Sequence, residues 1–106
     1  MNARVLIVDD ETVFRVVAEE ALSSEGFEIR TTGTLRGARE KLAVWSPDVV
    51  LLDRRLPDGD GIDFLKAIRA DGAAAPIVVV VTAYGHVANA VEAPHAGAWD
   101  YLSKPV

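Results

Sequence analysis

The chain has 106 residues, half of them hydrophobic and a quarter charged, which predicts one compact domain spanning residues 1–106 and not a disordered segment. The formal net charge of −5, with no basic run longer than Arg54-Arg55, argues against direct binding to nucleic acid. The longest apolar run, residues 77–81, is far shorter than the roughly 20 residues of a membrane span, so we expect a cytoplasmic protein without a membrane segment.

The first half of the chain alternates between strand-like and helix-like segments. It begins with a predicted strand at residues 5–8, followed by a helix with the apolar stripe Phe14, Val17, Ala18, Ala21 and Leu22. Gly26 is typical of a helix end, and residues 27–31 form the second predicted strand. The next helix carries the apolar stripe Leu35, Ala38, Leu42 and Trp45.

The second half of the chain continues the alternation. Residues 49–52 and 77–81 are continuous Val, Ile and Leu runs, which are typical of parallel strands covered on both faces. Between them lie a turn-rich segment at 56–61 and a helix with the apolar stripe Ile62, Leu65 and Ile68. A short helix at 87–93 and a strand at 98–102 complete five strands and four helices. The pattern predicts an α/β fold with helices flanking a parallel sheet.

Polar side chains follow four of the predicted strands. They are Asp9 and Asp10 after the first strand, Asp53 after the third, Thr82 after the fourth and Lys104 after the fifth. Ligands of open parallel sheets bind at the carboxyl ends of the strands, so we expect these groups to converge. Three crowded carboxylates favour a hard cation such as Mg²⁺. An aspartate can also be the nucleophile of phosphoryl transfer, with the metal, the ammonium and the hydroxyl neutralising charge.

Several short motifs occur in a specific order along the chain. They are IVDDE at residues 7–11, Asp53 followed by LPDGDG at 56–61, Thr82-Ala83, and YLSKP at 101–105. Together they resemble the receiver domains of bacterial-type two-component response regulators, and those of the nitrogen-regulator type most of all. The resemblance covers nearly the whole chain and implies a flavodoxin-like, doubly wound sheet of five parallel strands in the order 2-1-3-4-5.

The resemblance also assigns roles to the acidic residues. It implies that Asp53 accepts a phosphoryl group from a sensor histidine kinase. It implies that Asp9 and Asp10 bind Mg²⁺ together with Asp53 and the backbone carbonyl of Arg55. We therefore expect a phosphoacceptor domain that assists its own phosphorylation and dephosphorylation, and not an enzyme.

Three further roles follow from the same resemblance. Thr82 and Lys104 would contact the phosphoryl group, and Tyr101 would be the aromatic side chain that changes rotamer on activation. In receivers the fourth helix and the fifth strand form the signalling face, and this face would then control an output such as transcription, through an output domain in the same full-length chain. His86 and His95 have no partner at metal-ligand spacing, so we expect neither to act in catalysis.

Other interpretations stay open at this point. Asp9 and Asp10, taken alone, could cap the first helix, and Tyr101 could be ordinary strand packing. The chain could be a pseudo-receiver that only contacts proteins. It could also be an aspartate-nucleophile phosphatase, although that class places its nucleophile after the first strand in a D-x-D arrangement.

Two features depart from the receiver pattern. The sequence stops at Val106, before the fifth helix that usually follows the Lys-Pro motif, either because it is a piece of a longer regulator or because this receiver is unusually short. Without that helix we expect apolar side chains of strands one, three, four and five to meet water. An uncovered face of this kind favours self-association. Pro94 directly follows the residues 87–93 predicted as the fourth helix, at a position where receivers usually have a non-proline residue, and it should end this helix early or kink it, because proline removes a helical hydrogen bond.

Overall fold

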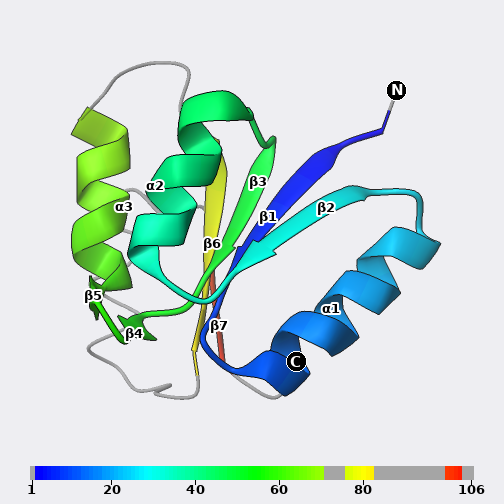
Figure 1. Cartoon of the computed structure of the whole chain (residues 1–106), viewed down its shortest axis with the longest axis horizontal. Helices are drawn as coiled ribbons and strands as arrows, with labels where there is room; N and C mark the ends of the chain where they lie inside the picture. The colour runs from blue at the N-terminus through cyan, green and yellow to red at the C-terminus, as the bar shows by residue number, and fades with distance from the viewer. Residues whose placement is uncertain (1, 71–75, 83–99, 104–106) are drawn as a thin grey trace.

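A parallel five-stranded sheet forms the centre of the computed structural model, which describes residues 2–70, 76–82 and 100–103 (Figure 1). The strands of this sheet are β1 (Arg4–Val8), β2 (Glu28–Thr32), β3 (Val49–Leu52), β6 (Ile77–Thr82) and β7 (Asp100–Ser103). They lie in the order β2-β1-β3-β6-β7. This confirms the predicted order 2-1-3-4-5, and the predicted strand bounds differ from the observed ones by two residues at most.

The described helices lie on both sides of the sheet, with α2 (Leu35–Val44) and α3 (Gly61–Ala70) on one side and α1 (Thr12–Ser24) on the other (Figure 1). Local sequence explains where they begin and end. The Thr34 side chain caps α2 by accepting the Gly37 N–H at 3.0 Å. Gly26, with a φ of 92°, turns the chain out of α1 as predicted, and Phe27 donates its N–H to the Leu22 carbonyl at 3.2 Å.

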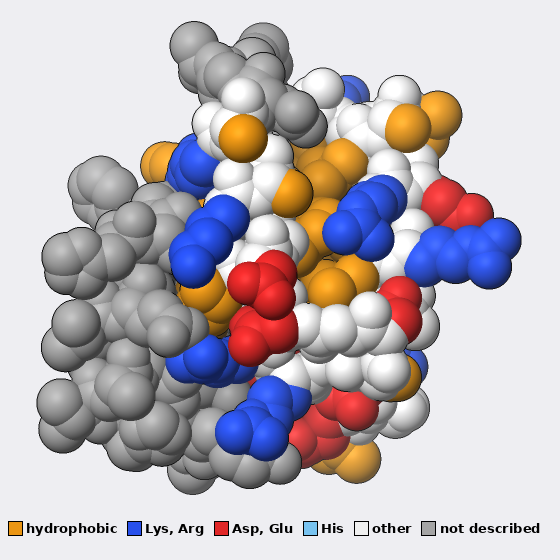
Figure 2. Space-filling view, turned by 90° about the vertical axis from the view of Figure 1, so that its left-hand side faces the viewer, with side chains coloured by type: hydrophobic (Ala, Val, Ile, Leu, Met, Phe, Trp, Pro, Cys, Tyr) orange, Lys and Arg blue, Asp and Glu red, His pale blue; other side chains and the backbone are white. Residues whose placement is uncertain are grey.

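The main core lies between the sheet and the helices α2 and α3. Alternate residues of the three central strands point into it and are at most 1% exposed: Leu6, Val8, Val50, Leu52, Val78 and Val80. The helices contribute the predicted residues Leu35, Ala38, Ile62 and Leu65. Seen from this side, the molecule carries charged side chains of both signs, with hydrophobic side chains visible between them (Figure 2). Side chains on one face recur every two residues in a strand and every 3.6 residues in a helix, and the apolar positions of both patterns pack together in this core.

On the opposite face of the sheet, the expected exposure to water is wrong for one strand. Val5 and Ile7 of β1 are only 4% and 0% exposed, so the prediction that strand one meets water is wrong. Ile77 and Leu102 are 45% and 40% exposed, as expected for strands four and five. Val49 and Leu51 of strand three are partly buried. Val81, on the same face of strand four, is only 2% exposed, so exposure on this face is confined to particular positions such as Ile77 and Leu102.

The stripe predicted for α1 was too wide. Phe14, Ala18 and Leu22 are partly buried, whereas Val17 and Ala21 are exposed. Residues four apart stack along one line of a helix, and Val17 and Ala21 lie on a neighbouring line, rotated away from the sheet. Apolar spacing alone did not separate the two lines, because α1 is apolar on both.

The predicted turn at 56–61 contains a small hairpin of β4 (Arg55–Leu56) and β5 (Gly59–Asp60), paired antiparallel. Gly59, with a φ of 154°, allows the tight return of the chain, and the hairpin leads directly into α3. The predicted helix at 87–93 and Pro94 lie outside the described residues. Within the described ranges, none of the helices is both long and apolar enough to cross a membrane.

Candidate metal centre

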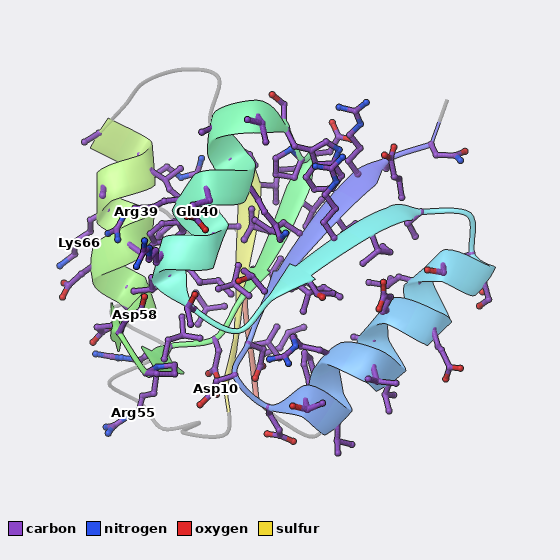
Figure 3. The ribbon with its side chains drawn as sticks, viewed as in Figure 1. Asp10, Arg39, Glu40, Arg55, Asp58 and Lys66 are labelled. Atoms are coloured by element: carbon purple, nitrogen blue, oxygen red, sulfur yellow. The ribbon has the colours of Figure 1, made fainter. Side chains whose placement is uncertain are left out.

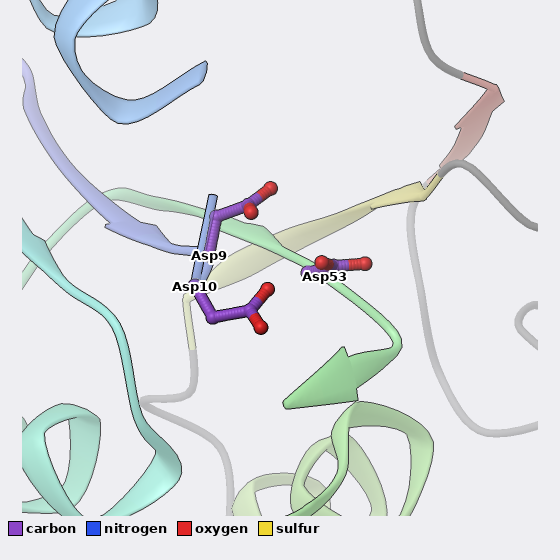
Figure 4. A group of neighbouring side chains, drawn as sticks. All are labelled: Asp9, Asp10 and Asp53. Carbon is purple, nitrogen blue, oxygen red and sulfur yellow. The ribbon is translucent and has the colours of Figure 1, made fainter. Parts of the chain in front are cut away.

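Three carboxylates meet at the carboxyl ends of β1 and β3 (Figure 4). One oxygen each from Asp9, Asp10 and Asp53 lies within 4.8 Å of the others. Strand register produces this meeting, because Val8 pairs with Leu52 and the acids directly follow these two residues. Asp9 is 1% exposed and Asp53 6%, while Asp10 is open to solvent. The predicted convergence of the acidic residues is therefore observed.

Backbone hydrogen bonds fix the two buried acids in place. The Asp53 N–H donates to the Val8 carbonyl at 2.9 Å, and the Asp9 N–H donates to the Thr32 carbonyl at 3.0 Å. Nη1 of Arg15 donates to the Asp9 carbonyl at 2.6 Å. These bonds extend the sheet by one residue beyond β1 and β3, so the carboxylates project from a rigid edge.

Helix capping does not account for the acidic pair. The N-cap residue of α1 is Glu11, and Asp9 Oδ1 accepts the N–H of Glu11 itself at 2.9 Å. A side-chain cap would instead satisfy an N–H in the first turn of the helix. Capping would also leave the burial of Asp53 beside the pair unexplained.

The segment after Asp53 is anchored to the start of α3. Gly61 donates its N–H to the Arg54 carbonyl at 2.6 Å, and Asp60 Oδ1 accepts the Ile62 N–H at 2.8 Å. Arg54 also forms an ion pair with Asp60 at 3.5 Å. A Cβ at position 61 would collide with the backbone carbonyl of Asp53, so the close approach of α3 to the end of β3 requires glycine there.

The structure describes only parts of the other residues that were predicted to belong to the site. Thr82 ends β6 directly beside Ser103 of β7, so its backbone reaches the same end of the sheet as the acids. Arg55 lies in β4, two residues past Asp53, and its side chain is exposed. The side chains of Thr82 and Tyr101, and Lys104 as a whole, lie outside the described part of the structure.

Two residues near the centre were missed by the sequence analysis. One is Arg15, which supports the Asp9 backbone from α1. The other is Asp58, at the tip of the β4–β5 hairpin, whose carboxylate accepts the Leu35 and Arg36 N–H groups at 2.8 and 2.9 Å. These two hydrogen bonds hold the pKa of Asp58 below its ordinary value of 3.8. Asp58 is 23 residues from Leu35 in the chain, so no local pattern signals this contact.

The donor set fits magnesium. Three carboxylates supply hard oxygen ligands, and a divalent cation would offset the repulsion among them. Because Asp10 is exposed, the cluster is accessible from solvent, which suits an ion that keeps part of its water shell. An open hollow of about 380 Å³ lies beside the hairpin and is lined by Arg54, Arg55, Leu56, Gly59 and Asp60.

Fold and site together define a flavodoxin-like α/β domain with an acidic centre at the carboxyl ends of its strands. The chain matches the response regulator receiver domain family over residues 5–106, and it belongs to this family. The resemblance to receivers inferred from the sequence motifs is thereby confirmed.

Known relatives agree with this assignment. The regulatory protein AtoC of Escherichia coli (strain K12) is 44% identical over 102 residues, which cover 96% of this chain and 22% of AtoC. The DNA-binding transcriptional regulator NtrC of Proteus hauseri is 39% identical over 104 residues, covering 98% of this chain and 22% of NtrC. The chain thus spans about a fifth of the length of these regulators.

Solved structures share the fold. The solution structure of the beryllofluoride-activated NtrC4 receiver domain dimer superposes with a TM-score of 0.89 at 38% identity, covering 97% of this chain and 84% of that one. This neighbour also supports the nitrogen-regulator type of receiver predicted from the sequence.

Proposed function

We propose that this domain is the Mg²⁺-dependent phosphoacceptor of a two-component response regulator, with Asp53 as the acceptor. The observation that carries the proposal is the meeting of Asp53 with Asp9 and Asp10 within 4.8 Å at the end of the sheet. Asp9, Asp10, Asp53 and the backbone carbonyl of Arg55 would hold the ion. When bound, Mg²⁺ would neutralise the charge of the carboxylates and of the incoming phosphoryl group.

The reaction needs little beyond positioning. A carboxylate oxygen of Asp53 attacks the phosphorus of a phosphohistidine on a sensor kinase, the new O–P bond forms, and the N–P bond to histidine breaks. The histidine nitrogen keeps the electron pair of that bond. Water later attacks the phosphorus of the acyl phosphate, which releases inorganic phosphate and restores Asp53. Asp53 is held for this role by its backbone hydrogen bond to Val8.

The phosphoryl group would be read by residues on the neighbouring strands. We assign Thr82 and Lys104 to contacts with the phosphoryl oxygens, and Tyr101 to a rotamer change that alters the signalling face. Two relatives are named as regulatory and transcriptional regulator proteins and extend well beyond the matched region. We therefore place the output, such as transcription, in an output domain of the full-length chain.

Mass spectrometry after incubation with Mg²⁺ and acetyl phosphate tests the proposal. The chain should gain one base-labile phosphoryl group, and Asp53→Asn should gain none, because an amide cannot act as the nucleophile. Asp63→Asn is the matched control, since Asp63 is an exposed acid on α3, and it should be phosphorylated like the parent chain. Phosphate on a serine or threonine, or none with the parent chain, would reject the assignment.

The same samples distinguish the proposed function from the two alternatives, a pseudo-receiver and an aspartate-nucleophile phosphatase. A pseudo-receiver would gain no phosphoryl group in the presence of Mg²⁺. An aspartate-nucleophile phosphatase would release phosphate from phosphate esters with turnover, whereas a receiver would not turn over such substrates.

We also propose that the domain self-associates through α1. Val13, Val16 and Val17 on this helix are 70%, 52% and 59% exposed, and exposed apolar patches mark association sites. A related receiver has been solved as a dimer.

Light scattering over a concentration series tests this association and should show a rise in mass that Val17→Lys abolishes. Val44→Lys, at a valine that is 79% exposed on α2, should leave the rise unchanged. A constant mass at all concentrations would rule the association out.

A further inference from the structure

We infer that Asp58 is a positioning residue of the phosphorylation site, because it fastens the loop after Asp53 to the start of α2. Figure 3 shows Asp58 beside the first turn of this helix. Its two carboxylate oxygens each accept one backbone N–H, Oδ1 from Leu35 at 2.8 Å and Oδ2 from Arg36 at 2.9 Å. Hydrogen bonds to an ionised acceptor are stronger than neutral ones, and two of them fix the direction of the carboxylate as well as its position.

The loop has a second anchor at its other end. Gly61 donates to the Arg54 carbonyl at 2.6 Å, and the Arg54–Asp60 ion pair closes the base of the hairpin at 3.5 Å. Asp58 holds the tip of the hairpin. The tip also packs on α2, since a Cβ added at Gly59 would lie 2.9 Å from Leu35 Cδ1. The hairpin is thus tied to α3 at its base and to α2 at its tip.

Arg55 lies between these two anchors. The inference rests on the proposed function, in which the Arg55 backbone carbonyl is a ligand of Mg²⁺. Mg²⁺ demands near-octahedral geometry, so a ligand on a loop binds well only when the loop is held in place. Releasing the tip should therefore weaken Mg²⁺ binding, although Asp58 itself does not contact the ion. Nothing needs to change at Asp9, Asp10 or Asp53.

Capping α2 does not explain Asp58 by itself. The helix already has a local cap, because Thr34 Oγ1 accepts the Gly37 N–H at 3.0 Å. Both residues satisfy N–H groups in the first turn of α2, but of the two only Asp58 belongs to the loop after Asp53 and joins that turn to it. Thr34→Ala is therefore the matched control. It weakens the start of α2 and leaves the hairpin attached.

The coupling between Mg²⁺ binding and the Asp58 hydrogen bonds must act in both directions. If Asp58 links the loop to α2, then Mg²⁺ bound at the loop stabilises the Asp58 hydrogen bonds, and the Leu35 and Arg36 amides exchange hydrogen more slowly. This effect is absent if Asp58 only stabilises the helix. Amide exchange at these two residues is thus a readout that does not depend on phosphorylation.

Calorimetric titration with Mg²⁺ alone, combined with amide hydrogen exchange, tests the inference. Asp58→Ala should raise the Mg²⁺ dissociation constant about fivefold or more, the lower end of typical coupling between sites, and Thr34→Ala should change it by less than about twofold. Asp58→Asn keeps one acceptor oxygen and should fall between the two. Mg²⁺ should slow exchange at Leu35 and Arg36 in the parent chain and in Thr34→Ala, but not in Asp58→Ala.

The outcomes separate this inference from the proposed function. Thermal melts first establish that each variant is folded under the conditions used. If the parent chain binds Mg²⁺ and Asp58→Ala binds it equally well, Asp58 is only a structural cap and the inference is overturned. If Thr34→Ala weakens Mg²⁺ binding as much as Asp58→Ala, loss of helix stability explains both, and the inference is again overturned. If the parent chain does not bind Mg²⁺, the proposed function fails first and the inference falls with it.

Discussion

At the amino ends of the strands acidic groups meet donors, whereas at the carboxyl ends they meet one another. Asp48, just before β3, accepts the Arg4 N–H at 2.8 Å, and Glu28 forms an ion pair with Arg4 at 3.4 Å. The guanidinium groups of Arg4 and Arg30 lie over the ring of Trp45, at 5.8 and 4.7 Å from its centre. At the other end of the same strands, three carboxylates lie within 4.8 Å of each other.

This difference between the two ends of the sheet means that the amino end stabilises the fold, whereas the carboxyl end is arranged to bind a cation. The amino end combines opposite charges and an aromatic ring, which favour the folded state even without a ligand. The carboxyl end brings like charges together, which costs stability until a cation binds. Substitutions of the same kind at the two ends should therefore have effects of opposite sign on stability, and only those at the carboxyl end should change Mg²⁺ affinity.

Trp45→Ala should give the largest effect. Trp45 is 5% exposed within the core, so truncation should cost about 3–5 kcal/mol of unfolding free energy, measured by urea denaturation. Trp45→Phe keeps most of the packing and should be folded enough for a Mg²⁺ titration, in which its affinity should equal that of the parent chain. Reduced Mg²⁺ affinity in Trp45→Phe would show that the two ends of the sheet are coupled.

Asp10→Asn should lower the affinity for Mg²⁺ and raise the stability of the metal-free protein. Mg²⁺ affinity should fall by about tenfold or more, a change of about 1.4 kcal/mol, because a charged oxygen ligand is lost. The metal-free protein should become more stable by about 1 kcal/mol, the order of the repulsion between two unit charges about 4 Å apart in water. Urea denaturation in EDTA measures this gain. A loss of stability without metal would contradict the crowding of like charges.

Asp48→Asn is the matched substitution at the amino end and should have a smaller effect of the opposite sign. The amide still accepts the Arg4 N–H, but without the charge, so a loss of about 0.5 kcal/mol is expected. Mg²⁺ affinity and phosphorylation should match the parent chain. A stabilised Asp48→Asn variant would remove the contrast between the two ends.

The smallest expected effect concerns acid stability and Asp58. Because the folded-state pKa of Asp58 is below 3.8, its ionised form favours folding at neutral pH, and this contribution is lost as the pH falls through the folded-state pKa. Asp58→Asn should therefore lower the urea midpoint at pH 7 and have less effect at pH 3. Parallel losses at both pH values would mean that the charge of Asp58 is not involved.

Sequence reasoning predicted the sheet well and the interactions between elements poorly. Continuous apolar runs identified β3 and β6, and the rule for parallel sheets correctly predicted that Asp9, Asp10 and Asp53 lie together. The exposure of Val17 was missed because α1 is apolar on two neighbouring lines.

The role of Asp58 was missed for a different reason. In sequence Asp58 is an ordinary turn acid, and its partners Leu35 and Arg36 lie on another element. Local patterns specify where elements begin and end, but contacts between loops and helices depend on how the elements pack. Residues that position a site through contacts with another element are therefore the ones that cannot be predicted from a single sequence.

The pairing of β1 with β3 also affects how the domain is made. Val8 and Leu52 are far apart in the chain, and their alignment brings Asp9 and Asp53 together. A slip of one residue in this alignment would turn the side chains of one strand to the other face of the sheet and separate the acids. Such distant pairing is slow to form because loop closure opposes it. The acidic centre can therefore exist only in chains whose sheet has closed in the correct register, so under the proposed function a newly synthesised domain cannot be phosphorylated before it has folded.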